Sequence, residues 1–250
     1  MAPPRINYDL KAVAPCPSCP VYGDSFCAHL LQSTVDDATR SWGAGGTERL
    51  VGPRKLILRP GEVVGGIPVL CDGWAASRVT APNGNRQILG ILLPGDVLSS
   101  GLLFESECTS AVEAITDVRY RVWPRPQFKA ALLASPDLFQ RLSRIWVNEL
   151  AQKDRLILDL GQLGAEVRIA RLFLDLFERL SERGLTRDLV IDFPLRHHQI
   201  ADLTGLSPTH VSKIVAEYRR SGLIEMAGRS LAIRDMAALR RTADMPERRV

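Results

Sequence analysis

The sequence predicts an α+β protein in which a small antiparallel β-barrel, or jelly roll, is followed by a long dimerisation helix and a C-terminal winged helix-turn-helix. Three observations predict this architecture. Short apolar runs alternate with turn residues between about residues 50 and 128. A stretch with no helix breaker extends from Pro136 to about Leu163. Two short helical patterns joined by a tight turn then occupy residues 196–222, and a hairpin pattern follows them.

The β-rich region shows the regular spacing of short strands that a small barrel requires. Its apolar runs cover residues 55–58, 67–71, 74–80, 87–93, 110–115 and 118–123. Glycines at positions 61, 73, 84 and 95 stand in the turns between runs, where backbone with positive φ is needed. Asn83-Gly84, between two of the runs, is a strong signal for a two-residue hairpin.

The long helical stretch carries apolar residues at heptad spacing. One seam holds Phe139, Trp146, Leu150, Ile157 and Leu160, with Ser143 and Lys153 at its polar positions. A second row can pack on the chain's own domain: Leu142, Ile145, Leu156 and Leu163. Because an exposed apolar seam is unfavourable, we expect a parallel homodimer, the alternative being a long helix packed within one subunit. Residues 166–183 predict a further amphipathic helix.

Residues 196–222 have the pattern of a helix-turn-helix. Ser207 and Pro208 are favourable as N-cap and first residue of the second helix, and Gly222 suits a left-handed C-terminal position. A buried stripe is predicted at Val211, Ile214, Val215 and Tyr218, and the opposite face carries Thr209, Ser212, Lys213, Ala216 and Arg220. Small, polar and cationic residues on that face suit a recognition helix in a major groove. The alternative is an ordinary helical hairpin with a solvated face.

The distribution of charge supports double-stranded DNA as the partner. Residues 196–250 hold 10 Lys and Arg against 6 Asp and Glu, whereas the remaining residues hold 22 of each sign. The excess positive charge thus lies with the predicted reading helix, as attraction to phosphates requires. The hairpin predicted after Gly222 turns at residues 227–229 and is a wing, with Arg229 and Arg234 available to phosphates.

Other classes of protein have less support. No apolar run reaches the roughly 18 to 20 residues that span a bilayer, and the N-terminus lacks the apolar core of a signal peptide, so we expect a cytoplasmic protein with no membrane partner. We find no Ser/His/Asp, P-loop or paired-carboxylate pattern with supporting context, which argues against an enzyme. A non-DNA ligand-binding protein stays open, and it would lack salt-dependent DNA affinity.

The order of barrel, long helix and winged helix resembles the CRP/FNR family of bacterial transcription regulators. The resemblance covers about residues 50–234 and rests on PGEVV, DGW, NGNRQI, LLPGD and GLSPTHVSKIVAEYRRSGLI. It implies a cyclic-nucleotide-binding-like barrel and a homodimer on a palindromic operator, with RNA polymerase as a further partner. Thr209, Ser212 and Lys213 fall at the family's base-reading positions, where Thr209 replaces a usual glutamate and Lys213 a usual arginine. His198 and Gln199, at the start of the first helix, are expected to contact phosphates.

The resemblance also bears on the effector. Cyclic-nucleotide binders in the family use a Gly-Glu pair and an Arg-Ser pair around the cyclic phosphate. Here the stretch GDVLSSGLLFESECTSAVEA has no acid at the first position and no arginine near Thr109-Ser110. Because a buried anion without a cation is costly, control by cAMP is not expected.

The N-terminal cysteines offer another effector. Cys16, Cys19 and Cys27, spaced C-x2-C-x7-C, resemble the iron–sulfur ligands of FNR-type oxygen sensors, which implies a metal site and a 4Fe–4S cofactor. The family's fourth cysteine falls at Arg121. Either Cys108, in a predicted loop, or Cys71, predicted to be buried in a strand, substitutes for it, or the site has three thiolates and another ligand, or there is no cube. A thiol redox switch, a zinc site, and no chemistry at all are the alternatives.

These features divide the chain into four predicted parts. Residues 1–47 form a cysteine-containing sensory segment, residues 48–134 the β-barrel, residues 135–164 the dimerisation helix, and residues 165–250 the winged helix DNA-binding domain.

Overall fold

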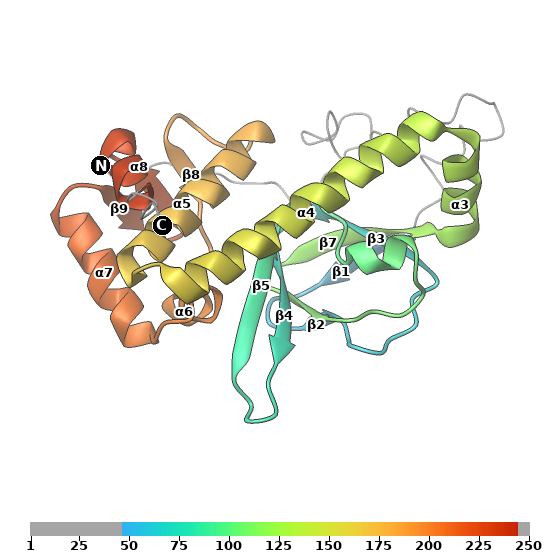
Figure 1. The fold of residues 1–250 in the computed structure, drawn as a ribbon, viewed down its shortest axis with the longest axis horizontal. Helices are drawn as coiled ribbons and strands as arrows, with labels where there is room; N and C mark the ends of the chain where they lie inside the picture. The colour runs from blue at the N-terminus through green and yellow to red at the C-terminus, as the bar shows by residue number, and fades with distance from the viewer. Residues whose placement is uncertain (1–46, 245–250) are drawn as a thin grey trace. The chain divides into compact units, whose positions relative to one another are not determined.

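The structure, a computed structural model, describes residues 47–244 (Figure 1). These residues form two compact units whose boundary falls between Lys153 and Asp154, within helix α4 (Pro136–Gln162). The N-terminal unit is rich in strands, and the C-terminal unit is mainly helical. The predicted α+β fold is confirmed.

The N-terminal unit contains two antiparallel sheets. One has the strand order β1-β7-β3 and the other the order β2-β6-β4-β5. The strands are β1 (Thr47–Val51), β2 (Leu56–Leu58), β3 (Gly66–Asp72), β4 (Ala75–Thr80), β5 (Arg86–Leu92), β6 (Ala111–Ala114) and β7 (Val118–Pro124). Each of the six predicted apolar runs is a strand; β1 was not predicted. A short 3-10 helix, η3 (Ser100–Leu103), precedes β6.

The four predicted turn glycines adopt positive φ, with values of 76° at Gly61, 84° at both Gly73 and Gly84, and 97° at Gly95. Gly73 is constrained twice, because a Cβ there would also lie 2.1 Å from the backbone oxygen of Asp117. The hairpin predicted at Asn83-Gly84 joins β4 and β5.

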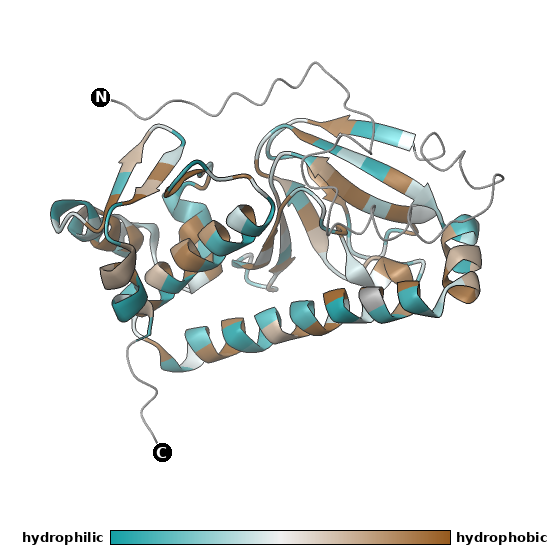
Figure 2. Ribbon diagram, turned by 90° about the horizontal axis from the view of Figure 1, so that it is seen from above, coloured by the Kyte–Doolittle hydropathy of each residue, from teal (hydrophilic) through white to brown (hydrophobic). Residues whose placement is uncertain are grey.

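Helices α3 (Arg125–Ala134) and α4 cover one apolar cluster of the barrel, which includes Ile67, Val69 and Trp123. Leu142 is buried in this cluster and Ile145 packs against it, so these two members of the predicted second row do pack on the chain's own domain. The sequence did not predict α3 as a separate helix. Hydrophobic and hydrophilic residues alternate along α4 (Figure 2), and no helix among the described residues is long and apolar enough to cross a membrane.

The C-terminal unit is built around α5 (Ala165–Glu182), whose buried face includes Phe173 and Leu176. The other elements are β8 (Val190–Asp192), α6 (His197–Thr204), α7 (Pro208–Arg220), β9 (Ile224–Ala227), β10 (Ser230–Ile233) and α8 (Met236–Ala243). Strands β9 and β10 form the predicted wing hairpin, and β8 extends it in the order β8-β10-β9. The short strand β8 and helix α8 were not predicted.

Candidate nucleic-acid interface

Helix α7 is held in place by its apolar stripe. Val211, Ile214, Val215 and Tyr218 are all buried, as predicted. The Tyr218 hydroxyl donates to the backbone oxygen of Glu166 in α5 at 2.7 Å, and burial raises the pKa of this phenol above its usual value. At the other end, the Ser207 hydroxyl accepts from the His210 N–H at 3.2 Å, which makes Ser207 the predicted N-cap.

The turn between α6 and α7 is fixed by Gly205 and Arg168. Gly205 has a φ of 65°, and a Cβ there would lie 2.8 Å from Cδ2 of Leu160. The Arg168 guanidinium donates to the backbone oxygens of Leu163 at 2.8 Å and Thr204 at 3.0 Å. Leu160, predicted at the dimer seam, is therefore half-buried against its own C-terminal unit.

The predicted reading face of α7 is open to solvent. Thr209, Ser212, Lys213 and Ala216 are exposed on the side opposite the buried stripe. Among the residues that the structure describes, no carboxylate forms an ion pair with Lys213. Small side chains around an unengaged ammonium allow a close approach to base edges. The structure thus places the three predicted base-reading residues, Thr209, Ser212 and Lys213, on one accessible surface.

The arginines predicted to contact phosphates are not free in this structure. Arg229 pairs with Asp192 at 2.8 Å, Arg234 pairs with Glu225, and Arg220 pairs with Glu217 on its own helix. Each of Arg229 and Arg234 has a carboxylate partner in the folded unit, but both side chains are exposed, so phosphate contact by these two arginines stays a prediction. To bind a phosphate, each must exchange that partner.

The start of α6 holds the two remaining predicted DNA contacts. His198 is exposed, whereas Gln199 is half-buried and its Oε1 accepts from the backbone N–H of Arg196 at 2.9 Å. The Gln199 side chain thus caps the helix with its oxygen, and its amide NH2 group is the part left for a phosphate.

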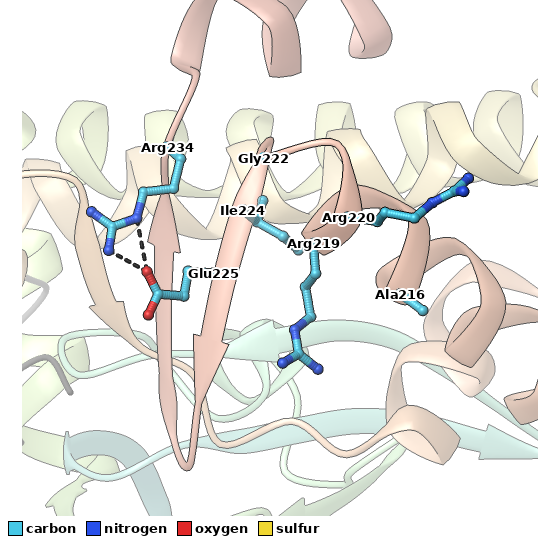
Figure 3. A pocket seen from close by; sticks show the side chains of 7 residues that line it. All are labelled: Ala216, Arg219, Arg220, Gly222, Ile224, Glu225 and Arg234. Carbon is cyan, nitrogen blue, oxygen red and sulfur yellow. Dashed lines mark hydrogen bonds and ion pairs between the residues drawn. The ribbon is translucent and has the colours of Figure 1, made fainter. Parts of the chain in front are cut away.

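A concavity of about 530 Å³ lies between the C-terminal half of α7 and the wing (Figure 3). Arg219, Arg220 and Arg234 contribute to its lining. Sequence reasoning missed Arg219, since it lies beside the predicted reading face; the Arg219-Arg220 pair at the end of the helix was the available signal.

The predicted seam of α4 is largely exposed. The exposed fraction is 55% for Phe139, 42% for Trp146, 61% for Leu150 and 70% for Ile157. Lys153 forms an ion pair with Glu149 of the same helix at 2.9 Å. The Trp146 ring also stacks on Phe104, from the loop after η3, with ring centroids 4.1 Å apart.

The cysteine predictions have different outcomes. Cys16, Cys19 and Cys27 lie outside the described residues, and residues 47–244 contain no cluster of three or more His, Cys, Asp or Glu suited to a metal ion. Cys108 lies in a loop as predicted, but it is 1% exposed and its thiol donates to the backbone oxygen of Ser110 at 3.0 Å. To bind a cluster, Cys108 would have to leave this buried position, so its role as the fourth ligand stays a prediction. Cys71, predicted to be buried, is half-exposed at the edge of β3.

Arg121, at the position of the family's fourth cysteine, lies in β7 opposite Glu48 of β1. Its guanidinium is 3.6 Å from the Glu48 carboxylate, and Arg119 lies 3.9 Å from the same carboxylate. This position therefore serves as an ion-pair site across the sheet.

Comparison with known families decides the assignment. Residues 48–135 match the cyclic nucleotide-binding domain, and residues 167–242 match the Crp-like helix-turn-helix domain. The chain belongs to the CRP/FNR family. As a CRP/FNR protein it is a DNA-binding transcription regulator, with α6 and α7 forming the helix-turn-helix.

Individual CRP/FNR proteins match over most of the chain. The transcriptional activator protein FnrL of Cereibacter sphaeroides is 28% identical over 233 residues, covering 90% of each chain. The CRP-like cAMP-activated global transcriptional regulator of Mycobacterium tuberculosis is 26% identical over 190 residues, 75% of this chain and 84% of its own. The structure of FixK2 from Bradyrhizobium japonicum aligns with a TM-score of 0.72 at 25% identity, covering 79% of this chain and 96% of that one.

The interior of this CRP/FNR barrel is filled with apolar side chains. Leu70, Leu102, Cys108, Val112 and Tyr120 belong to one buried cluster. Arg125, which begins α3, donates to the backbone oxygen of Leu102 at 2.7 Å. Its charge is therefore engaged with the backbone next to η3.

Proposed function

We propose that this protein is a homodimeric regulator that binds a palindromic operator in the cytoplasm, where oxygen or redox state gates it through Cys16, Cys19 and Cys27. The observation that carries the gating proposal is the C-x2-C-x7-C pattern directly before a CRP/FNR barrel. Thiolates at this spacing can share one iron–sulfur cube, here a 4Fe–4S cluster. The protein is proposed to act by binding alone, with no enzymatic step, and to work with RNA polymerase.

The exposed seam of α4 supports the dimer. Four large apolar side chains at heptad positions, each at least 42% exposed, are unfavourable in water. A second copy of α4 would cover them, as in a parallel two-stranded coiled coil. Two copies of α7 related by a two-fold axis would then read two half-sites about one helical turn apart.

Two observations support cysteines rather than a nucleotide as the effector site. The similarity to FnrL covers 90% of the chain, so it extends into the segment before Thr47, whereas the cAMP-activated relative matches 75%. In addition, Leu102 and Cys108 fill the barrel interior near η3, and Arg125 already binds backbone there. A cyclic phosphate would have to displace apolar packing without gaining a free cation.

Cys71 fits the role of fourth ligand better than Cys108. Cys108 would have to leave a core in which it is 1% exposed and break its hydrogen bond to Ser110. Cys71 is half-buried, and its thiol donates to the backbone oxygen of Val69 at 3.7 Å. Val69 pairs with Arg121, the family's ligand position, across β3 and β7. When bound, a cluster at these thiolates would supply an oxygen-labile centre.

The stack of Phe104 on Trp146 supplies a route from the barrel to the dimer seam. Phe104 belongs to the loop between η3 and β6, the loop that also contains Cys108, and Trp146 lies on the seam. We propose that Lys153 leaves the dimer marginal without a cluster, because two like charges face each other across a parallel seam. An N-terminal cluster would then shift this balanced monomer–dimer equilibrium toward the dimer.

Anaerobic purification tests the gating proposal. We expect a coloured protein that contains iron and sulfide and whose DNA affinity falls after exposure to air. Cys71→Ser should lose iron, and Cys108→Ser should retain it. A colourless, iron-free protein prepared without oxygen contradicts the cluster and leaves the regulator assignment standing.

A second candidate is a CRP/FNR regulator without a cluster, controlled by thiol oxidation, by zinc, by another effector or by its expression level. The replacement of the family's fourth cysteine by Arg121 favours it. In that case DNA affinity would respond to a thiol oxidant, to a chelator, or to neither, in a protein that contains no sulfide.

A further inference from the structure

The concavity beside α7 combines an apolar floor with a cationic rim. Ala216, Gly222 and Ile224 line it together with Arg219, Glu225 and Arg234 (Figure 3). In Figure 3 the Arg219 side chain extends along β9, whereas Arg220 points away from the wing. Arg234 and Glu225 meet on the opposite side of β9 from Arg219. The concavity is thus bordered by Arg219 on one side and by an ion pair on the other.

Positive charge exceeds negative charge around this concavity. Arg219 is exposed, and no carboxylate within residues 47–244 forms an ion pair with it. The hydrogen bond from Arg234 lowers the pKa of Glu225 below its usual value, and the charge of Arg219 adds a smaller effect in the same direction. Both arginines therefore stabilise the ionised Glu225 carboxylate, Arg234 by direct contact and Arg219 more weakly. Arg220 points away from the wing and pairs with Glu217, so two guanidinium groups, those of Arg219 and Arg234, face one carboxylate, and the negative C-terminal end of α7 offsets part of that excess.

The length of α7 places this concavity beyond the bases. Thr209 and Arg219 are ten residues apart, roughly 15 Å along a helix that rises 1.5 Å per residue. The major groove is about 12 Å wide. When Thr209 and Lys213 lie at base edges, Arg219 is at the level of the backbone that borders the groove.

We propose that this concavity is a seat for a DNA backbone phosphate outside the base-read half-site, with Arg219 and Arg234 as its donors. This proposal rests on the proposed function, in which α7 reads the bases of DNA. Arg219 meets the phosphate first, and Arg234 then exchanges the Glu225 carboxylate for a phosphate oxygen, which accepts the same forked donor geometry. The apolar floor, which includes the buried Ile224, accommodates the deoxyribose.

Glu225 has a specific role in this arrangement. In the free protein it holds Arg234, and in the complex its charge opposes the incoming phosphate. It therefore weakens binding to every DNA backbone, and the base contacts of α7 offset this cost only at the sequence that α7 reads. Removing the charge, as in Glu225→Gln, should strengthen binding to DNA of any sequence.

The test compares Arg219→Ala, Arg219→Gln, Arg234→Ala and Glu225→Gln with the wild type by fluorescence anisotropy. The probes are a 40-bp duplex of random sequence and a duplex selected in vitro with the wild-type protein, each titrated between 50 and 200 mM salt. Arg241→Ala is the matched control, because Arg241 is an exposed arginine on α8. Thermal unfolding of each variant verifies that the winged helix is intact.

We expect both Arg219 variants to weaken binding to both duplexes by the same factor, and to reduce the slope of log K against log salt by about 0.9, the value for one lost phosphate contact. Glu225→Gln should tighten binding to the random duplex several-fold, and Arg241→Ala should change nothing. Unchanged salt slopes for the Arg219 variants overturn the proposal, as does weaker binding by Glu225→Gln. If Arg219→Ala is silent while Lys213→Ala alters sequence preference, only the phosphate seat fails. If neither Arg219→Ala nor Lys213→Ala changes DNA binding, the proposal that α7 reads DNA fails as well.

Discussion

Helices α4 and α7 are both amphipathic, but their outer faces differ. The outer face of α7 carries Thr209, Ser212 and Lys213, all exposed and short or charged. The outer face of α4 carries Trp146, Leu150 and Ile157, which are exposed and apolar. The same helical period therefore presents one surface that remains favourable in water and one that does not. The first suits a hydrated, anionic partner such as DNA, and the second suits another copy of the same helix.

The buried faces of the two helices are alike, because both pack mainly aliphatic residues against the rest of the chain, Leu138 and Leu142 on α4 and Val211, Ile214 and Val215 on α7. The residues on the buried faces are thus explained by packing within the fold, and those on the exposed faces indicate what each helix binds. If this comparison is right, a substitution on each outer face should affect one kind of association first.

The largest effect is expected from Ile157→Asp. Two aspartates would face each other at the dimer seam, where an unpaired buried charge is strongly unfavourable. We expect self-association to weaken by about 100-fold or more, roughly 3 kcal/mol. Sedimentation equilibrium measures it, with Leu133→Asp as the control, since Leu133 is 89% exposed on α3 and lies off the seam. A dimer that tolerates Ile157→Asp would show that the exposed seam has another purpose.

Lys213→Ala should affect DNA instead. Loss of a base contact costs about 1–3 kcal/mol and relaxes specificity at one position of the half-site. Competition with singly substituted duplexes measures the loss, and Arg241→Ala again serves as the control. Self-association should not change. If Lys213→Ala weakens binding to all sequences equally, Lys213 contacts phosphate and not a base.

Two glycines that flank α7, Gly205 at the C-terminus of α6 and Gly222 after α7, distinguish the cost of backbone strain from the cost of packing. Gly205 and Gly222 have φ values of 65° and 75°, so alanine at either costs about 1–2 kcal/mol of backbone energy. At Gly205 the new Cβ also meets Leu160, whereas at Gly222 nothing lies within 4 Å. Gly205→Ala should therefore lower the free energy of unfolding more than Gly222→Ala, as measured by urea denaturation. Equal losses would mean that Leu160 moves aside without cost.

Arg229→Ala should lower the free energy of unfolding by an amount that depends on pH. Burial already raises the pKa of Asp192 above its usual value, and Arg229 is the cation that opposes this shift. Without Arg229, the ionised carboxylate should cost about 1 kcal/mol, a small value because Arg229 is largely exposed. As pH falls through the folded-state pKa, Asp192 takes up a proton and the loss should shrink. Denaturation at pH 8 and pH 5 measures it, and a loss that grows on acidification would contradict this origin.

Lys153→Ala should have the smallest effect. It removes like charges from the seam but also an exposed ion pair with Glu149, which is worth little. We expect cluster-free protein to dimerise a few-fold more tightly. If Lys153→Ala dimerises no better than the wild type without metal, Lys153 does not hold the dimer in balance.

Local patterns were enough to predict much of the fold. Turn glycines such as Gly84 and the N-cap Ser207 act through their own backbone or near neighbours, and the structure confirms them. The partner of Arg229 was not predictable, because Asp192 lies 37 residues away and comes into contact through the pairing of β8 with β10. The burial of Cys108 was not predictable for the same reason, since its loop position is local but its burial depends on strands from the whole barrel.

The most direct test of a two-fold reader is the stoichiometry of its complex with DNA. Sedimentation velocity on wild-type protein and Ile157→Asp, each with a duplex selected in vitro by the wild type, measures it. We predict two chains per duplex on a palindromic sequence for the wild type, and loss of both dimer and high affinity for Ile157→Asp. One chain per duplex, or full affinity in the Ile157→Asp variant, would contradict the coupling of the α4 seam to DNA reading by α7.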